Sequence, residues 1–134
     1  PMFAGLGGAE IPEGKDLDGK NIWEGVVSGT NPRKGEMIYA VRHHGGFSDV
    51  GGRRDRWKVK REGKSPWTFF NIEEDISEQR DLSSQYPELM QSMITEIEQW
   101  SQSHTEPEWF YVQEEADRWE ELDMPRYGET FRLK

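Results

Sequence analysis

Apolar and polar residues alternate in the centre of the chain. In the run from Arg56 to Lys60, Trp57 and Val59 fall on one face and three cations on the other. This two-residue period predicts a half-buried β-strand. Residues 62–66 include a glycine and a proline and predict a turn. The apolar, aromatic run at 67–72 predicts a second strand.

Residues 85–103 predict a helix, because their apolar residues recur at helical spacing. Ser84 is expected to cap its N-terminus, with Glu88 in the first turn. The apolar stripe has the width typical of a helix that packs on a sheet, which indicates an α+β arrangement. The stripe consists of Leu89, Met90, Met93, Ile94, Ile97 and Trp100.

An earlier strand is predicted at 36–44. Its two faces carry Met37, Tyr39, Val41 and His43 on one side, and Ile38, Ala40, Arg42 and His44 on the other. Both faces are largely apolar at the start of the run, so we expect a strand that is covered on both sides. The next eight residues, 45–52, contain four glycines and predict a loop.

The two ends of the chain predict shorter elements. Met2, Phe3 and Leu6 share one helical face, and a short helix is expected at 22–28 with Gly29 at its C′ position. After residue 104 an aromatic cluster at 107–111 precedes a short amphipathic helix at 112–122. We expect this aromatic tail to wrap back onto the body, and a free sugar-stacking platform is the alternative.

Composition narrows the function classes. The 134 residues suit one domain with a modest core, to which six Trp, six Phe and four Tyr contribute. The sequence has no cysteine, which excludes disulfides, thiolate metal sites and a cysteine nucleophile within these residues. It has no apolar run long enough to cross a membrane, so no membrane partner is expected.

Charge is unevenly distributed along the chain. The net charge is −9, yet residues 53–64 hold seven basic and two acidic residues, and the remainder holds ten basic and 24 acidic residues. An acidic protein with one basic strand is not suited to general nucleic-acid binding. The basic strand could contact an anionic ligand, or it could simply be a solvated charged face.

The order of the central motifs resembles the C-terminal subdomain of the sulfatases, in the alkaline phosphatase superfamily. The matching pieces are a basic Trp-Lys strand at 53–58, a strand ending in Phe69-Phe70-Asn71-Ile72, a loop at 75–78, the segment Asp81-Leu82-Ser83 and the helix. Ile76 stands where the family usually has proline. The resemblance implies a small four-stranded antiparallel sheet with the C-terminal helix packed on it, plus the aromatic tail.

The resemblance also implies a domain organisation. Residues 1–35 would be a linker with a short helix that follows a catalytic domain, 36–104 the sheet-and-helix subdomain, and 105–134 the tail. The chain begins Pro1-Met2, so we expect it to be a fragment of a longer protein. Its expected partners are the N-terminal catalytic sulfatase domain and a sulfated small molecule or glycan. A periplasmic or extracellular setting is compatible with this, although localisation stays unknown.

Sulfatase chemistry, as the family implies it, uses a formylglycine made from Cys or Ser in a Cys/Ser-x-Pro-x-Arg motif, with a calcium ion against the sulfate. That motif is absent from these 134 residues, and their aspartates form no metal-ligand series. We therefore expect no cofactor, metal site or catalytic residue within this chain. The whole protein would be a sulfuric ester hydrolase, and the fragment would be inactive alone.

Four residues are candidates for substrate contact: His43, His44, Arg53 and Arg54. Loops between the C-terminal strands of sulfatases can approach the mouth of the active site. Adjacent histidines on a strand point to opposite faces, which disfavours a shared metal ion. The structural alternative is an exposed hairpin loop with ordinary histidines.

Two other functions stay open from the sequence. The chain could be a stand-alone carbohydrate-binding or interaction module without catalysis. Alternatively, the whole enzyme could be a phosphonate or phosphate hydrolase of the same superfamily, which only the missing residues would distinguish.

Overall fold

The computed structural model describes residues 1–15, 17–44, 47–104 and 113–122. The chain divides into two compact units, residues 1–34 and 35–134. The aromatic cluster at 107–111, Val112 and the last twelve residues lie outside the described residues. The sequence predictions made for those segments therefore stay predictions.

The first unit contains two short helices, α1 (Met2–Leu6) and α2 (Trp23–Ser28). Both were predicted. Gly29 follows α2 with φ +68°, the left-handed conformation expected of glycine at a helix C-terminus. Side chains of α1 and α2, including Phe3 and Val27, are largely exposed.

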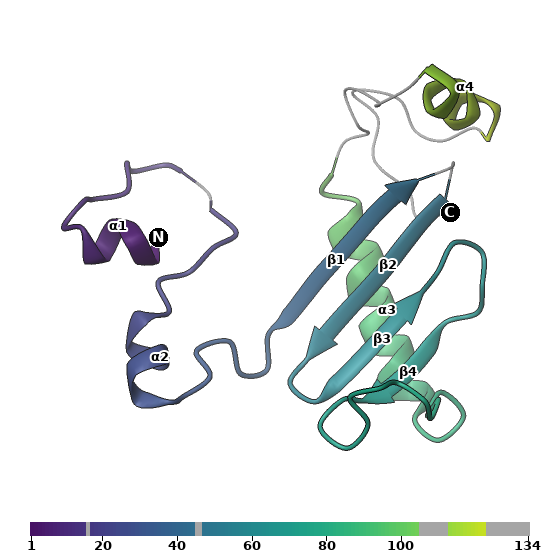
Figure 1. The fold of residues 1–134 in the computed structure, drawn as a ribbon, viewed down its shortest axis with the longest axis horizontal. Coiled ribbons are helices and arrows are strands. Elements are labelled where there is room, and N and C mark those ends of the chain that lie inside the picture. Colours follow the sequence, from purple (N-terminus) through teal and green to yellow (C-terminus); the bar gives the residue numbers. More distant parts are fainter. Residues whose placement is uncertain (16, 45–46, 105–112, 123–134) are drawn as a thin grey trace. The chain divides into compact units, whose positions relative to one another are not determined.

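The second unit is built on a four-stranded antiparallel sheet, which confirms the predicted α+β class. Its strands are β1 (Met37–His44), β2 (Phe47–Arg54), β3 (Trp57–Arg61) and β4 (Thr68–Asn71). They lie side by side in the order of the sequence (Figure 1). Val50 lies opposite Val41, and Val59 opposite Phe69.

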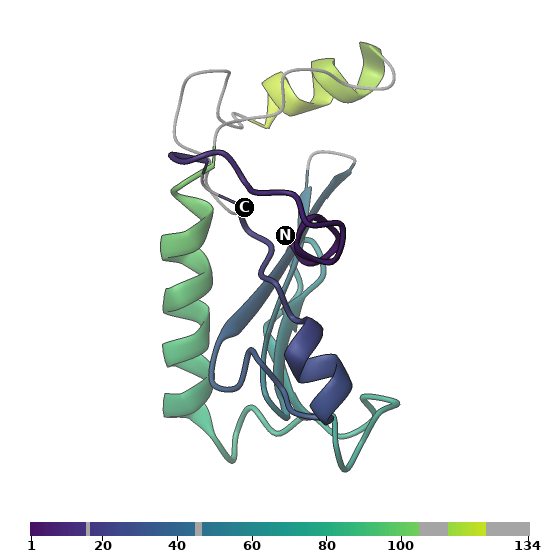
Figure 2. The ribbon, with the colours of Figure 1, turned by 90° about the vertical axis from the view of Figure 1, so that its left-hand side faces the viewer.

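Helix α3 (Pro87–Ser101) covers one face of this sheet (Figure 2). The predicted apolar stripe is confirmed, because Met93, Ile94 and Ile97 are buried against strand residues such as Val59 and Phe69. A further helix, α4 (Gln113–Glu121), has Trp119 buried, as its amphipathic pattern predicted.

Three local predictions are wrong. Residues 47–54 form β2 instead of a glycine-rich loop. Ser84 does not cap α3, because the helix begins at Pro87 with Tyr86 at the N-cap and no side-chain cap. Within the described part of the chain, the second face of β1 is not covered, since Ile38 is 51% exposed.

The connection between β4 and α3 wraps around the outer edge of β4. The Leu82 amide donates to the Phe69 carbonyl at 2.7 Å, and the Phe69 amide donates to Asp81 Oδ1 at 3.0 Å. These bonds satisfy backbone groups that an edge strand would otherwise leave unpaired. They also bury Leu82 in the core on the helix side.

Candidate functional site

The face of the sheet opposite α3, called here the open face, holds the candidate site. Because side chains alternate along a strand, the residues between the core positions project from this face. They are Ile38, Ala40 and Arg42 of β1, Asp49, Gly51 and Arg53 of β2, Lys58 and Lys60 of β3, and Thr68 and Phe70 of β4.

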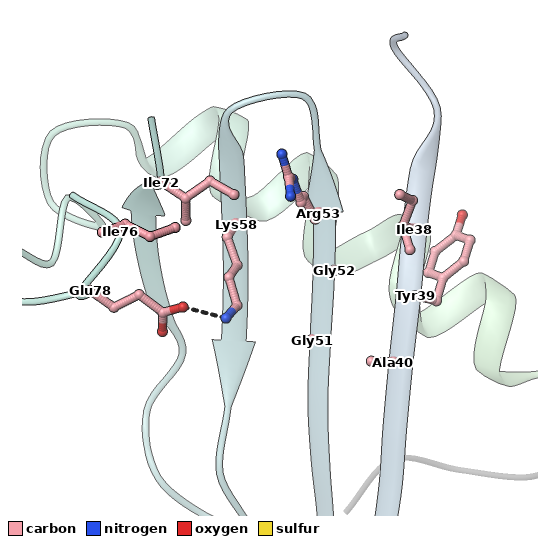
Figure 3. A pocket seen from close by; sticks show the side chains of 10 residues that line it. All are labelled: Ile38, Tyr39, Ala40, Gly51, Gly52, Arg53, Lys58, Ile72, Ile76 and Glu78. Carbon is pink, nitrogen blue, oxygen red and sulfur yellow. Dashed lines mark hydrogen bonds and ion pairs between the residues drawn. The ribbon is translucent and has the colours of Figure 1, made fainter. Parts of the chain in front are cut away.

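A groove of about 300 Å³ crosses the open face from β1 to the loop after β4 (Figure 3). Its floor is formed by Ala40 and Gly51, two small residues that pair across β1 and β2. Ile38 borders the groove on one side, and Ile72 and Ile76 border it on the other. The groove is therefore an aliphatic depression with cations beside it, since Arg53 and Lys58 also line it.

Two adjacent glycines of β2, Gly51 and Gly52, face opposite sides of the sheet. A Cβ on Gly51 would have the Val59 carbonyl oxygen as its nearest neighbour, at 3.7 Å, an ordinary contact. A Cβ on Gly52 would lie 2.7 Å from Ile97 Cδ1 and 3.1 Å from Met37 Sδ. Gly52 thus permits the close approach of α3, whereas Gly51 leaves space open above the sheet.

Glu78 holds the loop after β4 over the open face. Its carboxylate pairs with Lys58 and, at 2.9 Å, with Lys60. The side chain of Glu78 is only 18% exposed, and its φ of +54° is unusual for a residue other than glycine. The two ion pairs therefore join the loop directly to β3.

The acid stability of the chain should reflect this cluster. Burial acts to raise the pKa of Glu78, but hydrogen bonds from Lys58 and Lys60 outweigh it and hold the pKa below its usual 4.5. A carboxyl whose pKa is lower in the folded state stabilises the fold above its unfolded pKa, and this contribution is lost as pH falls through the folded pKa.

We therefore expect the melting temperature to fall more steeply in the wild type than in Glu78→Gln as the pH drops below the usual pKa of 4.5. At pH 7 the variant should lose about 1 kcal/mol of stability, since partly exposed ion pairs contribute modestly. Thermal unfolding followed by circular dichroism would measure both effects. The exposed Glu88→Gln is the control, and a pH profile for Glu78→Gln that parallels the wild type would contradict the prediction.

A second groove, of about 590 Å³, continues along the same face toward the β1–β2 turn. It shares Ala40, Gly51 and Lys58 with the first groove, and Arg42 lines it on β1. Asp49 accepts a hydrogen bond from the Gly63 amide at 2.9 Å, which ties the β3–β4 turn to β2. The open face is thus one continuous surface with an aliphatic end and a charged end.

The four residues predicted for substrate contact lie in two pairs at opposite ends of the β1–β2 hairpin. His43 and His44 end β1, whereas Arg53 and Arg54 pair with its first residues. Ile38, the strand partner of Arg53, is five residues from His43. At about 3.3 Å per residue, the nearest members of the two pairs are therefore about 17 Å apart along the strands. The structure therefore does not bring the four residues together.

The two arginines face opposite sides of the sheet. Arg53 projects from the open face, and its Nε donates to the Asp55 carbonyl at 2.9 Å. Arg54 lies on the helix side, where its guanidinium pairs with Glu96 of α3. Arg54 therefore joins β2 to the covering helix.

Tyr39 completes this link between sheet and helix. Its hydroxyl donates to Glu96 Oε1 at 3.0 Å, and its ring stacks on Trp100 at 4.6 Å. Burial and the neighbouring carboxylate raise the pKa of Tyr39 to about 12. Tyr39 therefore stays a neutral hydrogen-bond donor and holds α3 on β1.

Sequence reasoning missed most of the groove, namely Gly51, Lys58, Ile72, Ile76 and Glu78. One feature of the sequence pointed to the groove, because Ile38 and Ala40 make the second face of β1 apolar. The structure leaves Ile38 exposed on that face.

The described residues show neither a metal site nor a membrane span. Within the described ranges, no group of three or more His, Cys, Asp or Glu side chains is placed to hold a metal ion. Within the same ranges, no helix is both long and apolar enough to cross a bilayer.

Comparison with known proteins links this fold to larger chains. No protein-family model matches the sequence, and no curated protein does. Crystal structures of Ps i-CgsB, alone and in complex with k-i-k-neocarrahexaose, match 94% of this chain at 42% identity with a TM-score of 0.88. The chain spans only 28% of the length of those structures.

Two more distant structures share the fold. A Bacteroides thetaiotaomicron sulfatase from a locus for the metabolism of multiple glycosaminoglycans matches 74% of the chain at 16% identity, with a TM-score of 0.55. The protein yidJ of Bacteroides fragilis, assigned to the sulfatases, matches 74% at 20% identity, with a TM-score of 0.53. In each case the chain spans 23% of the larger protein.

Proposed function

From a chain that has the fold of a sulfatase C-terminal subdomain, we infer that the complete protein is a sulfuric ester hydrolase. The supporting observation is the match to Ps i-CgsB, at 42% identity over 94% of this chain. The chain spans only 28% of that protein, so most of the hydrolase would lie in residues outside this sequence.

A sulfated polysaccharide is the substrate class that we propose. The structure of Ps i-CgsB with bound k-i-k-neocarrahexaose supports a carrageenan-type oligosaccharide in preference to a small aryl sulfate. The subdomain would pack on the catalytic domain and form part of the wall of the substrate pocket.

The chain's own residues do not fit the catalytic groups of the family. It has no cysteine and no Ser-x-Pro-x-Arg segment, and its described residues form no cluster of metal ligands. The formylglycine and the calcium ion are therefore proposed to belong to the catalytic domain, and no chemical step is assigned to this chain.

The separation of the candidate residues limits how they could contact substrate. His43 and His44 end β1 beside the β1–β2 turn, whereas Arg53 lies at the far end of the hairpin. Arg54 is already paired with Glu96. We propose that the end of the hairpin with His43 and His44 faces the substrate, so His43→Ala with His44→Ala should raise KM more than Arg53→Ala does.

Sulfate release tests the proposed function. We expect the product of the complete coding region to release sulfate from carrageenan oligosaccharides, measured by ion chromatography, and the isolated 134 residues to release none. An aryl sulfate, a phosphate monoester and a phosphonate ester serve as comparison substrates. Hydrolysis of only the phosphorus esters would contradict the sulfatase assignment, as would sulfate release by the isolated chain.

Reading the coding sequence before Pro1 provides the matching genetic test. A Cys/Ser-x-Pro-x-Arg motif in the same frame supports the proposal. A frame without it, together with binding of sulfated oligosaccharide by the 134 residues, would favour a carbohydrate-binding module.

A further inference from the structure

We propose that the groove on the open face is the docking site for the catalytic domain of the same polypeptide. An aliphatic side chain of that domain would fill the groove between Ile38 and Ile76, and its carboxylates would pair with Arg42 and Arg53. This inference rests on the proposed function and adds to it the surface by which the two parts join.

Aliphatic side chains around the groove are exposed. Ile38 is 51% exposed and Ile76 is 81% exposed, and both border a depression floored by Ala40 and Gly51. Contiguous exposed apolar surface with charged residues at its rim is typical of protein–protein contact sites. The same arrangement would be unfavourable in water if nothing covered it.

The groove is preformed. The loop carrying Ile76 is fixed on both sides, by a hydrogen bond from the Arg80 amide to Asp75 Oδ2 at 2.8 Å and by the pairs of Glu78 with Lys58 and Lys60. A fixed loop that presents an exposed isoleucine loses little conformational entropy when a partner binds.

The length of the relative indicates what occupies the groove. This chain spans 28% of Ps i-CgsB, so further chain of more than twice this length accompanies the fold in that relative. The two grooves of the open face are lined by the cations Arg42, Arg53, Lys58 and Lys60 and by the carboxylates of Asp49, Glu62 and Glu78. Lys58 and Lys60 are paired with Glu78, so among the described lining residues Arg42 and Arg53 are the cations that would meet carboxylates of the partner.

The groove is less suited to a sugar. Tyr39 is its one aromatic lining residue within the described part of the chain, and its ring stacks on Trp100 on the helix side. No ring among the described lining residues is thus left to stack on a sugar, as the aromatic linings of many ligand sites do.

Thiol labelling of the complete protein tests this docking site. The 134 residues contain no cysteine, so an introduced thiol is the only one in this part of the protein. Ile76→Cys places it in the groove, and Gln91→Cys places it at an exposed position of α3 as the matched control. Maleimide labelling of each site is followed by mass spectrometry of its peptide.

We expect I76C to react about tenfold more slowly than Q91C in the native protein, because labelling must wait for the interface to open. In urea the two rates should be equal. Adding Gly51→Val, which fills the groove without touching the core, should restore fast labelling of I76C. Equal rates for I76C and Q91C in the native protein would overturn the inference.

Two other results would also overturn it. Protection of I76C that is lost on dilution would mean that a second copy of the chain occupies the groove. Protection that arises only after addition of a carrageenan oligosaccharide would mean that a glycan occupies it.

Sulfate release by the same preparations separates the two proposals. If the protein is active and I76C is labelled fast, the docking site is contradicted and the sulfatase assignment is supported. If the protein is inactive and I76C is protected, the docking surface is supported and the sulfatase assignment is contradicted.

Discussion

Phe69→Ala is expected to lower the free energy of unfolding by about 3–5 kcal/mol, the usual loss for a fully buried phenylalanine. The Phe69 side chain is completely buried between β4 and α3. Its ring stacks on Trp57 with centroids 5.2 Å apart and planes 9° from parallel. Alanine would remove this contact and leave a cavity that the paired strands cannot close.

Urea denaturation of the 134-residue chain, followed by tryptophan fluorescence, would measure this loss. Since a domain of this kind has about 5–15 kcal/mol of total stability, the loss is a large share of it, and the variant should unfold at a much lower urea concentration than the wild type. Phe3→Ala is the matched control, because Phe3 is 80% exposed in α1 and its loss should change stability by no more than about 0.5 kcal/mol. An unfolding midpoint for F69A equal to that of F3A would contradict the prediction.

Gly52→Val should destabilise the chain by about 1–3 kcal/mol, because it forces extra carbon atoms into a filled core. A Cβ at this position would lie 2.7 Å from Ile97 Cδ1 and 3.1 Å from Ile97 Cγ1, so the branched side chain would push α3 away from β2. The displacement would also strain the contacts of Glu96 with Arg54 and Tyr39, which hold the same helix.

Gly51→Val provides the control one residue away. It has the same chemistry, but its Cβ would enter the open groove and meet nothing closer than 3.7 Å. Valine also favours the extended backbone of a strand, so G51V should unfold at or above the wild-type midpoint. Equal destabilisation by G51V and G52V would show that the two faces of β2 are not packed differently.

The elements with a clear period could be predicted from the sequence. The alternation around Trp57 and Val59 identifies β3, and the six-residue stripe from Leu89 to Trp100 identifies α3. In both cases burial on one side imposes the pattern on the sequence. The matching order of these elements then indicated the fold.

The glycine-rich strand β2 could not be predicted in this way. Gly51 and Gly52 have low strand propensity, and they suggested a loop. A glycine stands at position 52 of this strand because α3 packs so closely there that a side chain would not fit. This is a tertiary requirement that the local sequence does not show. The same error explains why His43, His44, Arg53 and Arg54 were predicted to act together. The register of β2 places the two histidines and the two arginines at opposite ends of the hairpin.

The predicted N-cap at Ser84 failed for a related reason. Asp81 and Leu82 bind the outer edge of β4, and residues 83–85 then form a turn in which the Gln85 and Tyr86 amides donate to the Leu82 carbonyl at 2.9 and 3.1 Å. The helix then starts at Pro87, whose missing amide costs nothing in the first turn.

The strand order of the sheet has a consequence for how the subdomain forms. Each strand pairs with the next one along the chain, and α3 follows directly after β4. Contacts of such short sequence separation require only small loops to close, and this topology is associated with fast folding. The sheet can therefore assemble hairpin by hairpin during synthesis, and a largely finished surface would be offered to the catalytic domain that we propose.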